Sequence, residues 1–238
     1  MNYLDNDPDT EFINDICNDL IGAKILISYN ITFLNGTTDS GLIENIDIVG
    51  NSIQDILLPH LQNKIPTIEK GPKQKSPDFW NRNRSYEWEL KVFTGSPRFD
   101  VSNYISYIEQ LNKINGVNRK MFKTKYLIFK YTKRENYIVI EDFKLCSVWK
   151  LLSYNGVNPI SLQNKRGTWY TIRPCGFSNI GDDNKYPHTF IKNICKSILM
   201  CPNKLEDRNE KIQNINKQFT RCIFTDCLYA INNLTLSV

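Results

Sequence analysis

The chain has 238 residues, of which 41% are hydrophobic and 23% are charged, and its formal net charge is +5 at pH 7. This size predicts a single domain over residues 1–238 with one sizeable core, and no apolar run approaches the roughly 18 residues of a membrane span. The net charge is −9 over residues 1–60 (ten acids, one base) and +14 over residues 61–238 (29 bases, 15 acids), which indicates a polyanionic partner, with ordinary surface lysines as the alternative.

Two helices are predicted in the first quarter of the chain. Residues 9–21 carry apolar side chains at helical spacing, and residues 40–62 repeat this pattern after Ser40, a candidate cap, with Gly50 as an interruption. The acidic N-terminal stretch MNYLDNDPDTEF lacks the basic region of a secretory signal. We therefore expect a cytoplasmic protein.

The rest of the chain alternates predicted strands and helices. We expect a hairpin over residues 77–94, a helix over 100–114 capped by Asp100 or Ser102, strands over 123–131, 137–143 and 168–173, and helices over 189–200 and 208–219. This alternation predicts an α/β or α+β fold with a mixed sheet flanked by helices.

Several kinds of chemistry have no support in the residue types present. The seven cysteines show no C-x-x-C spacing and only two histidines, His60 and His188, are available, which disfavours a disulfide framework, a structural zinc ion and a histidine-assisted hydrolase. No G-x-G-x-x-G or P-loop pattern is present, so no nucleotide cofactor is predicted.

The stretch PDFWNRNRSYEWELK has the pattern of a hairpin with polar residues at defined positions. If residues 82–85 form a four-residue loop, Asn81 pairs with Tyr86, and continuing the ladder places Asp78 opposite Glu89. Directly opposite residues have Cβ atoms about 4.5–5.5 Å apart on the same face. The register therefore predicts two adjacent carboxylates.

Lys91 shares the face of Glu89 because a strand has a period of two. Two close carboxylates repel each other unless a cation lies between them, and an all-oxygen site of this kind suits Mg²⁺. A neighbouring lysine can orient the attacking water or balance developing charge. These residues are suited to phosphodiester hydrolysis, and a solvated strand face is the alternative interpretation.

The pattern Pro77-Asp78, ten intervening residues and Glu89-x-Lys91 resembles the PD-(D/E)xK nuclease superfamily, and GNSIQDILL resembles the helix that precedes this motif in type II restriction endonucleases. The resemblance implies a Mg²⁺-dependent enzyme, with Mn²⁺ as a substitute ion, that cuts double-stranded DNA at a short specific sequence and leaves 5′-phosphates. It implies Asp78, Glu89 and the Leu90 carbonyl as metal ligands, with Lys91 handling the water.

The resemblance also divides the chain. It implies an acidic helical segment over residues 1–40, a catalytic core with recognition strands over 41–175 and a C-terminal helical part over 176–238. Such enzymes often carry an acid near the position of Gln54, so a fourth acidic ligand would have to come from Asp55 or Glu44.

Basic and amide side chains in two stretches are candidates for DNA contact. The first group flanks the motif, and the second belongs to PISLQNKRGTWYTIRP, a stretch similar to a late basic-aromatic strand region of some restriction enzymes: Lys73, Lys75, Arg82 and Arg84, then Gln163, Asn164, Lys165, Arg166 and Arg173. A bacterial, cytoplasmic homodimer acting on a two-fold symmetric DNA site is expected. A repair nuclease or junction resolvase on the same core, or a nucleic-acid-binding module without catalysis, are the alternatives.

Overall fold

The computed structural model describes residues 10–26, 28–42, 46–72, 76–81, 86–113, 124–154 and 156–220. These residues form two compact units that are interleaved along the chain. The sheet unit contains the described parts of Asp9–Pro97 and Tyr126–Leu145, and the hairpin unit contains those of Arg98–Lys125 and Cys146–Val238. The single-domain organisation predicted from the sequence stays a prediction.

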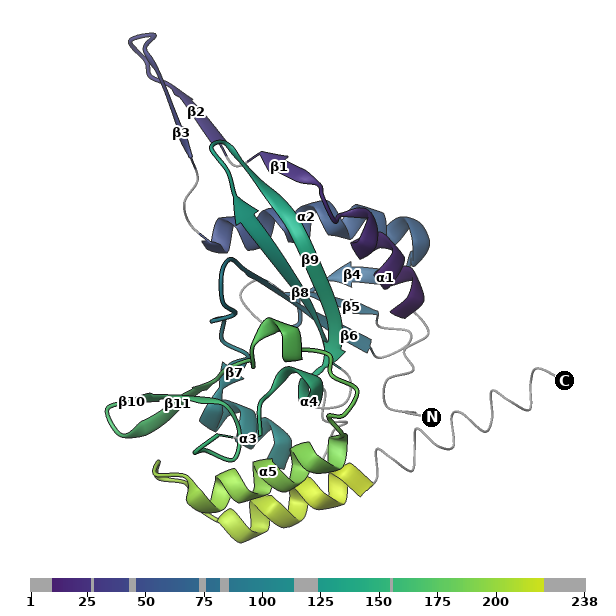
Figure 1. Cartoon of the computed structure of the whole chain (residues 1–238), viewed down its shortest axis with the longest axis vertical. Coiled ribbons are helices and arrows are strands. Elements are labelled where there is room, and N and C mark those ends of the chain that lie inside the picture. The colour runs from purple at the N-terminus through teal and green to yellow at the C-terminus, as the bar shows by residue number, and fades with distance from the viewer. Residues whose placement is uncertain are drawn as a thin grey trace, which may run out of the picture. The chain divides into compact units, whose positions relative to one another are not determined.

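The sheet unit is built on a six-stranded sheet of order β1-β9-β8-β6-β5-β4 (Figure 1). Its strands are β1 (Lys24–Leu26), β4 (Ile68–Lys70), β5 (Phe79–Asn81), β6 (Tyr86–Phe93), β8 (Thr124–Lys133) and β9 (Tyr137–Ser147). The expected strands at 123–131 and 137–143 are thus present and longer than predicted. Together with the helices below, the sheet confirms the α+β class.

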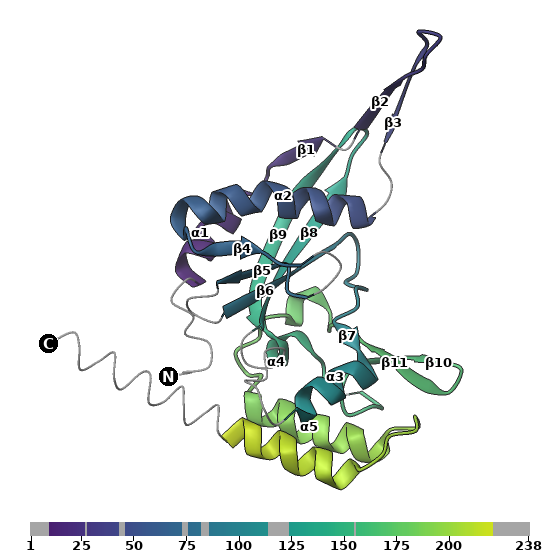
Figure 2. The same cartoon turned by 180° about the vertical axis from the view of Figure 1, so that it is seen from behind.

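Two helices, α1 (Thr10–Asp19) and α2 (Ile46–Lys64), cover one face of this sheet (Figure 2). Ile53, Leu57 and Leu61 recur at helical spacing on α2, and all three are buried in one core cluster with Phe79 and Trp88 of the sheet. Gly50 lies inside α2 and does not interrupt it. The apolar stripes read from the sequence therefore face the core as expected.

The expected helix cap at Ser40 is wrong, because Ser40 belongs to a hairpin of β2 (Ser28–Thr32) and β3 (Thr38–Leu42). The turn of this hairpin is local in origin. Asn35 accepts hydrogen bonds from the Thr37 amide and hydroxyl at 3.0 and 2.7 Å, and Gly36 supplies a positive φ of 81°. The Asn35-Gly36 pair between β2 and β3 is the signal in the sequence that predicts this hairpin.

The hairpin unit combines helices with a three-stranded sheet of order β10-β11-β7. Its elements are β7 (Ser102–Asn103), α3 (Tyr104–Asn112), α4 (Val148–Leu151), β10 (Leu162–Lys165), β11 (Thr168–Ile172), η3 (Phe177–Asn179), α5 (Pro187–Met200) and a helical run at 208–220. Tyr104, Tyr107, Trp149 and Phe190 are its largest fully buried side chains. The unit thus has an aromatic core of its own.

The cap of α3 also differs from expectation. Asn103, the last residue of β7, is the N-cap and accepts a hydrogen bond from the Ser106 amide at 3.0 Å, whereas Ser102 lies one residue before the cap and Asp100 forms an ion pair with Arg173. Asn, Asp and Ser are all good caps, so only tertiary pairing decides among neighbours. Within the described ranges, no helix is long and apolar enough to cross a membrane.

Candidate active site on the β5–β6 hairpin

The register of the hairpin is the one predicted from its turn length. Asn81 pairs with Tyr86 and Phe79 pairs with Trp88, so Asp78, which directly precedes β5, would fall opposite Glu89. The loop residues 82–85 lie outside the described residues. The predicted register is therefore confirmed for Phe79 to Asn81, and the juxtaposition of Asp78 with Glu89 one step further along stays a prediction.

Asp78 is held to β6 by backbone hydrogen bonds at two points. Its amide donates to the Trp88 carbonyl at 3.0 Å, and its carboxylate oxygen Oδ2 accepts from the Leu90 amide at 2.7 Å. A carboxylate that accepts a main-chain N–H is both fixed in position and stabilised in its charged form. Asp78 therefore presents an anionic group in a defined orientation.

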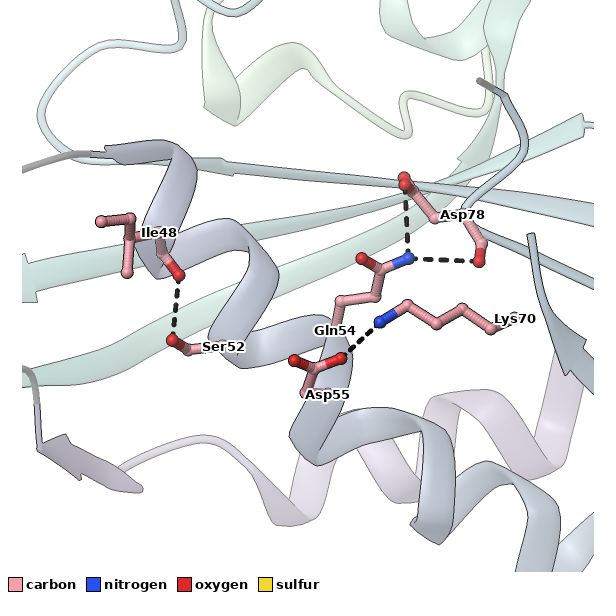
Figure 3. Close-up of polar contacts among 6 residues, drawn as sticks. All are labelled: Ile48, Ser52, Gln54, Asp55, Lys70 and Asp78. Carbon is pink, nitrogen blue, oxygen red and sulfur yellow. Dashed lines mark hydrogen bonds and ion pairs between the residues drawn. The ribbon is translucent and has the colours of Figure 1, made fainter. Parts of the chain in front are cut away.

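Gln54 reaches Asp78 from the middle of α2. Its Nε2 atom lies 3.2 Å from the Asp78 carbonyl oxygen and 3.5 Å from Oδ1, and the two side chains point toward each other in Figure 3. The residue Gln54 as a whole is 9% exposed. Gln54 is therefore a neutral donor that supports Asp78 through hydrogen bonds.

Glu89 and Lys91 form a sheltered ion pair on β6. The Lys91 Nζ atom lies 3.0 Å from Glu89 Oε1, and these side chains are 21% and 11% exposed respectively. Glu87, on the same strand, is only 6% exposed. The interpretation of this strand face as solvated is therefore wrong, because β6 is buried on both faces.

Of the two acids that could supply a fourth acidic ligand, only Asp55 is among the described residues. Asp55 turns to the surface, where its side chain is 66% exposed and pairs with Lys70 Nζ at 2.5 Å (Figure 3). Glu44 lies outside the described residues. The residues next to Asp78 on α2 thus contribute an amide and no carboxylate.

The donor set at this site consists of hard oxygen atoms. In the part of the chain that the structure describes, no group of three or more His, Cys, Asp or Glu side chains is placed to hold a metal ion. Two carboxylates and a main-chain carbonyl are nevertheless the kind of ligands that Mg²⁺ accepts, since this ion keeps several of its waters. The chemistry of the donors fits a divalent ion.

The residues predicted to contact DNA lie on the β10–β11 hairpin or outside the described residues. Lys73, Lys75, Arg82 and Arg84 belong to the second group. Asn164, Lys165 and Arg166 are exposed at the end of the hairpin, where Arg166 and Gly167 both have positive φ. The Lys165 ammonium lies 4.0 Å from the centroid of the Tyr170 ring, a distance suited to a cation–π contact.

Gln163 and Arg173 are joined at the base of the same hairpin. Arg173 pairs with Asp100 at 2.7 Å, donates to the Arg98 carbonyl, and donates through Nη2 to Gln163 Oε1 at 2.6 Å. The Thr171 hydroxyl donates to the same oxygen at 3.2 Å. Because guanidinium only donates, the Gln163 carbonyl faces Arg173 and the Gln163 amide nitrogen is turned away from it.

Comparison with known proteins agrees with this architecture. The model of the NgoBV restriction endonuclease family matches residues 14–231. The type II restriction enzyme NlaIV of Neisseria lactamica is 30% identical in an alignment of length 175 that covers 69% of this chain and 70% of that enzyme. A solved structure of NlaIV restriction endonuclease superimposes with a TM-score of 0.71 at 23% identity, covering 90% of this chain and 89% of the other.

The family match spans nearly the whole chain, and the structural match reproduces its mixed sheet and helices. Enzymes of this family generally use divalent metal ions, and their substrate is DNA. The chain belongs to the NgoBV restriction endonuclease family and is a type II site-specific deoxyribonuclease.

Proposed function

We propose that this enzyme hydrolyses phosphodiester bonds of double-stranded DNA at a short specific sequence, depends on Mg²⁺ and leaves 5′-phosphates. The observation that supports the proposal is the register of the β5–β6 hairpin, whose continuation by one step would set Asp78 opposite Glu89, together with the ion pair of Glu89 with Lys91. Mn²⁺ would serve as a substitute ion, because it accepts the same oxygen ligands.

Asp78, Glu89 and the Leu90 carbonyl would hold the ion. When bound, it polarises the scissile phosphate and favours ionisation of the attacking water. Asp78 supports this role because the Leu90 amide fixes its Oδ2, and Glu89 supports it because it is a buried acid on the strand that Asp78 contacts.

Lys91 would orient the attacking water and balance charge that develops on the phosphate. Its ammonium is held 3.0 Å from Glu89 Oε1, which anchors the long side chain beside the carboxylates. A lysine ammonium fixed in this way can donate hydrogen bonds to water or to a phosphate oxygen.

We further propose that the β10–β11 hairpin contacts DNA. Asn164, Lys165 and Arg166 are exposed on it, Gln163 and Arg173 stand at its base, and Lys73, Lys75, Arg82 and Arg84 would add phosphate contacts beside the active site. A two-stranded ribbon with basic residues at its turn has the dimensions of a major-groove reader. The enzyme would act in the bacterial cytoplasm, where its substrate is found.

A homodimer is the proposed assembly on DNA. The described chain offers one cluster of Asp78, Glu89 and Lys91, and a two-fold dimer places two such sites on the two strands of a palindrome. Sedimentation with a cognate duplex should give two chains per duplex. One chain per duplex, with nicked circles accumulating before linear DNA, would rule out the dimer and leave the active site standing.

Incubation of plasmid and genomic DNA with the enzyme and Mg²⁺ tests the function as a whole. Discrete fragments with 5′-phosphate ends are expected. A smear or structure-dependent cutting would favour a repair nuclease, and intact DNA with a gel shift would favour a binding module.

A further inference from the structure

The main-chain carbonyl of Asp78 is a point where two separate elements converge. Gly71, directly after β4, donates its amide hydrogen to this oxygen at 2.7 Å, and Gln54 of α2 donates to it at 3.2 Å. On the other side of Asp78, the Trp88 carbonyl and the Leu90 amide are bonded to its amide and carboxylate. Asp78 is thus held between two neighbouring strands.

The pairing of β4 with β5 explains why Gly71 meets Asp78. Lys70 pairs with Phe79 in an antiparallel register, so one further step along the ladder sets Gly71 opposite Asp78. Gly71 therefore continues β4 along the segment that leads into the candidate active site.

The approach of these two backbones leaves no room for a side chain. A Cβ atom on Gly71 would lie 1.6 Å from the Pro77 carbonyl oxygen, 2.7 Å from the Pro77 carbonyl carbon and 3.2 Å from the Asp78 oxygen. These are main-chain atoms and cannot rotate away as the end of a flexible side chain can. Gly71 is required here for close approach, since its φ is not in the left-handed region.

We propose that Gly71 is a positioning residue for the metal-binding carboxylate, an inference that rests on the proposed function of Asp78. Any side chain at position 71 displaces the Pro77–Asp78 segment from β4 and so shifts Asp78 relative to Glu89. The consequence is weaker binding of the divalent ion, while the buried core of the sheet unit, which lies on α2 and the strands, keeps its packing.

The test compares Gly71→Ala with Gly50→Ala in the full-length protein. Gly50 is the matched control, because a Cβ there meets only the Val92 methyl group at 3.5 Å, an ordinary van der Waals contact. Titration calorimetry with Mn²⁺ measures ion affinity directly, the Mg²⁺ concentration for half-maximal cleavage measures it in turnover, and thermal unfolding without metal measures the fold.

Gly71→Ala should weaken Mn²⁺ binding by about 10- to 100-fold, the range found when an outer support of a metal ligand is removed, and raise the half-saturating Mg²⁺ concentration similarly. Gly50→Ala should leave both values unchanged. Gln54→Met, which removes the second donor to the same carbonyl without adding bulk, should shift them in the same direction by less.

Three results separate the possible failures. Wild-type ion affinity in Gly71→Ala would overturn the inference, and so would a Gly71→Ala protein that fails to fold, because the residue would then serve folding and not the carboxylate. If Asp78→Asn itself retains both Mn²⁺ binding and cleavage, the proposed function of the site fails, and the role of Gly71 fails with it.

Discussion

The β5–β6 hairpin and the β10–β11 hairpin carry polar residues in opposite ways. On the first, Glu89 is buried, and Asp78 is tied to main-chain groups of the neighbouring strand. On the second, Asn164, Lys165 and Arg166 are exposed at the turn. The difference suits the two roles proposed above: hydrolysis needs groups held within a fraction of an ångström, whereas contact with a polyanion needs charges that solvent and DNA can reach.

The comparison is sharpest for the carboxylates. Asp78→Asn or Glu89→Gln should lower the cleavage rate by at least about 100-fold, as loss of one preorganised charged group does, and DNA binding should survive because repulsion of the phosphate is reduced. Plasmid cleavage and gel shift on the same preparations measure the two effects.

Asp55→Asn is the matched control for that experiment. Asp55 follows Gln54 on α2, but its carboxylate pairs with Lys70 at the surface, so its loss should leave cleavage near the wild-type rate. A Glu89→Gln enzyme that cuts at more than a few per cent of the wild-type rate would remove Glu89 from the site.

Replacing Mg²⁺ by Ca²⁺ should separate the two regions without any mutation. Ca²⁺ binds carboxylate oxygens but is larger and more loosely coordinated, so the enzyme should bind its site specifically and fail to cut it. Cleavage and gel-shift titrations with each ion test this. Robust cutting in Ca²⁺ alone would contradict the proposed roles of Asp78 and Glu89.

The sequence was sufficient to predict the β5–β6 hairpin because its register depends on one local feature. Once the strands leave a four-residue loop, Asn81 must pair with Tyr86, and every later pair follows. The burial of the hairpin could not be predicted from the local sequence. Glu87 and Glu89 alternate with apolar residues as on a solvated strand face, yet both are buried in the folded chain.

The role of Gly71 could not be predicted from the sequence either, because it depends on contacts between distant segments. In the sequence, Gly-Pro directly after β4 signals only a break. Its contact with Pro77 and Asp78 depends on the pairing of β4 with β5, and β4 has three residues, too short for periodicity to reveal. Likewise, the cap at Ser40 failed because this serine pairs in a β-hairpin, and the cap at Ser102 failed because α3 begins one residue later, after Asn103.

Gln163 combines features of both hairpins. It belongs to the β10–β11 hairpin, but its side chain is held by hydrogen bonds from Arg173 and Thr171. Its carbonyl is committed to these donors, so its amide nitrogen is the group available to an acceptor on a base edge. Gln163→Glu keeps the partner of Arg173 and replaces that donor by an anion. Cleavage of the cognate site should fall about 10- to 100-fold, the range of a lost base contact.

Competition cleavage between the cognate site and single-base variants measures the effect of Gln163→Glu. Thr168→Val is a suitable control, because the Thr168 hydroxyl donates to the Lys165 carbonyl within the turn and not to Gln163. Equal loss of cleavage at the cognate and variant sites would mean that Gln163 supports the hairpin and does not read a base.

The smallest expected effect concerns the exposed cations, and it completes the comparison. Lys165→Ala and Arg166→Ala each remove a charge that no described carboxylate neutralises in an ion pair, so each should lower DNA affinity several-fold on all sequences alike and reduce the salt-dependence slope by about 1. Fluorescence anisotropy at several salt concentrations measures both quantities. Once DNA is saturating, the cleavage rate of these variants should match the wild type, because neither residue belongs to the β5–β6 hairpin. A loss of maximal rate with unchanged affinity would show that the turn of β10–β11 acts on the chemical step. It would contradict the assignment of DNA binding to β10–β11 and of hydrolysis to β5–β6.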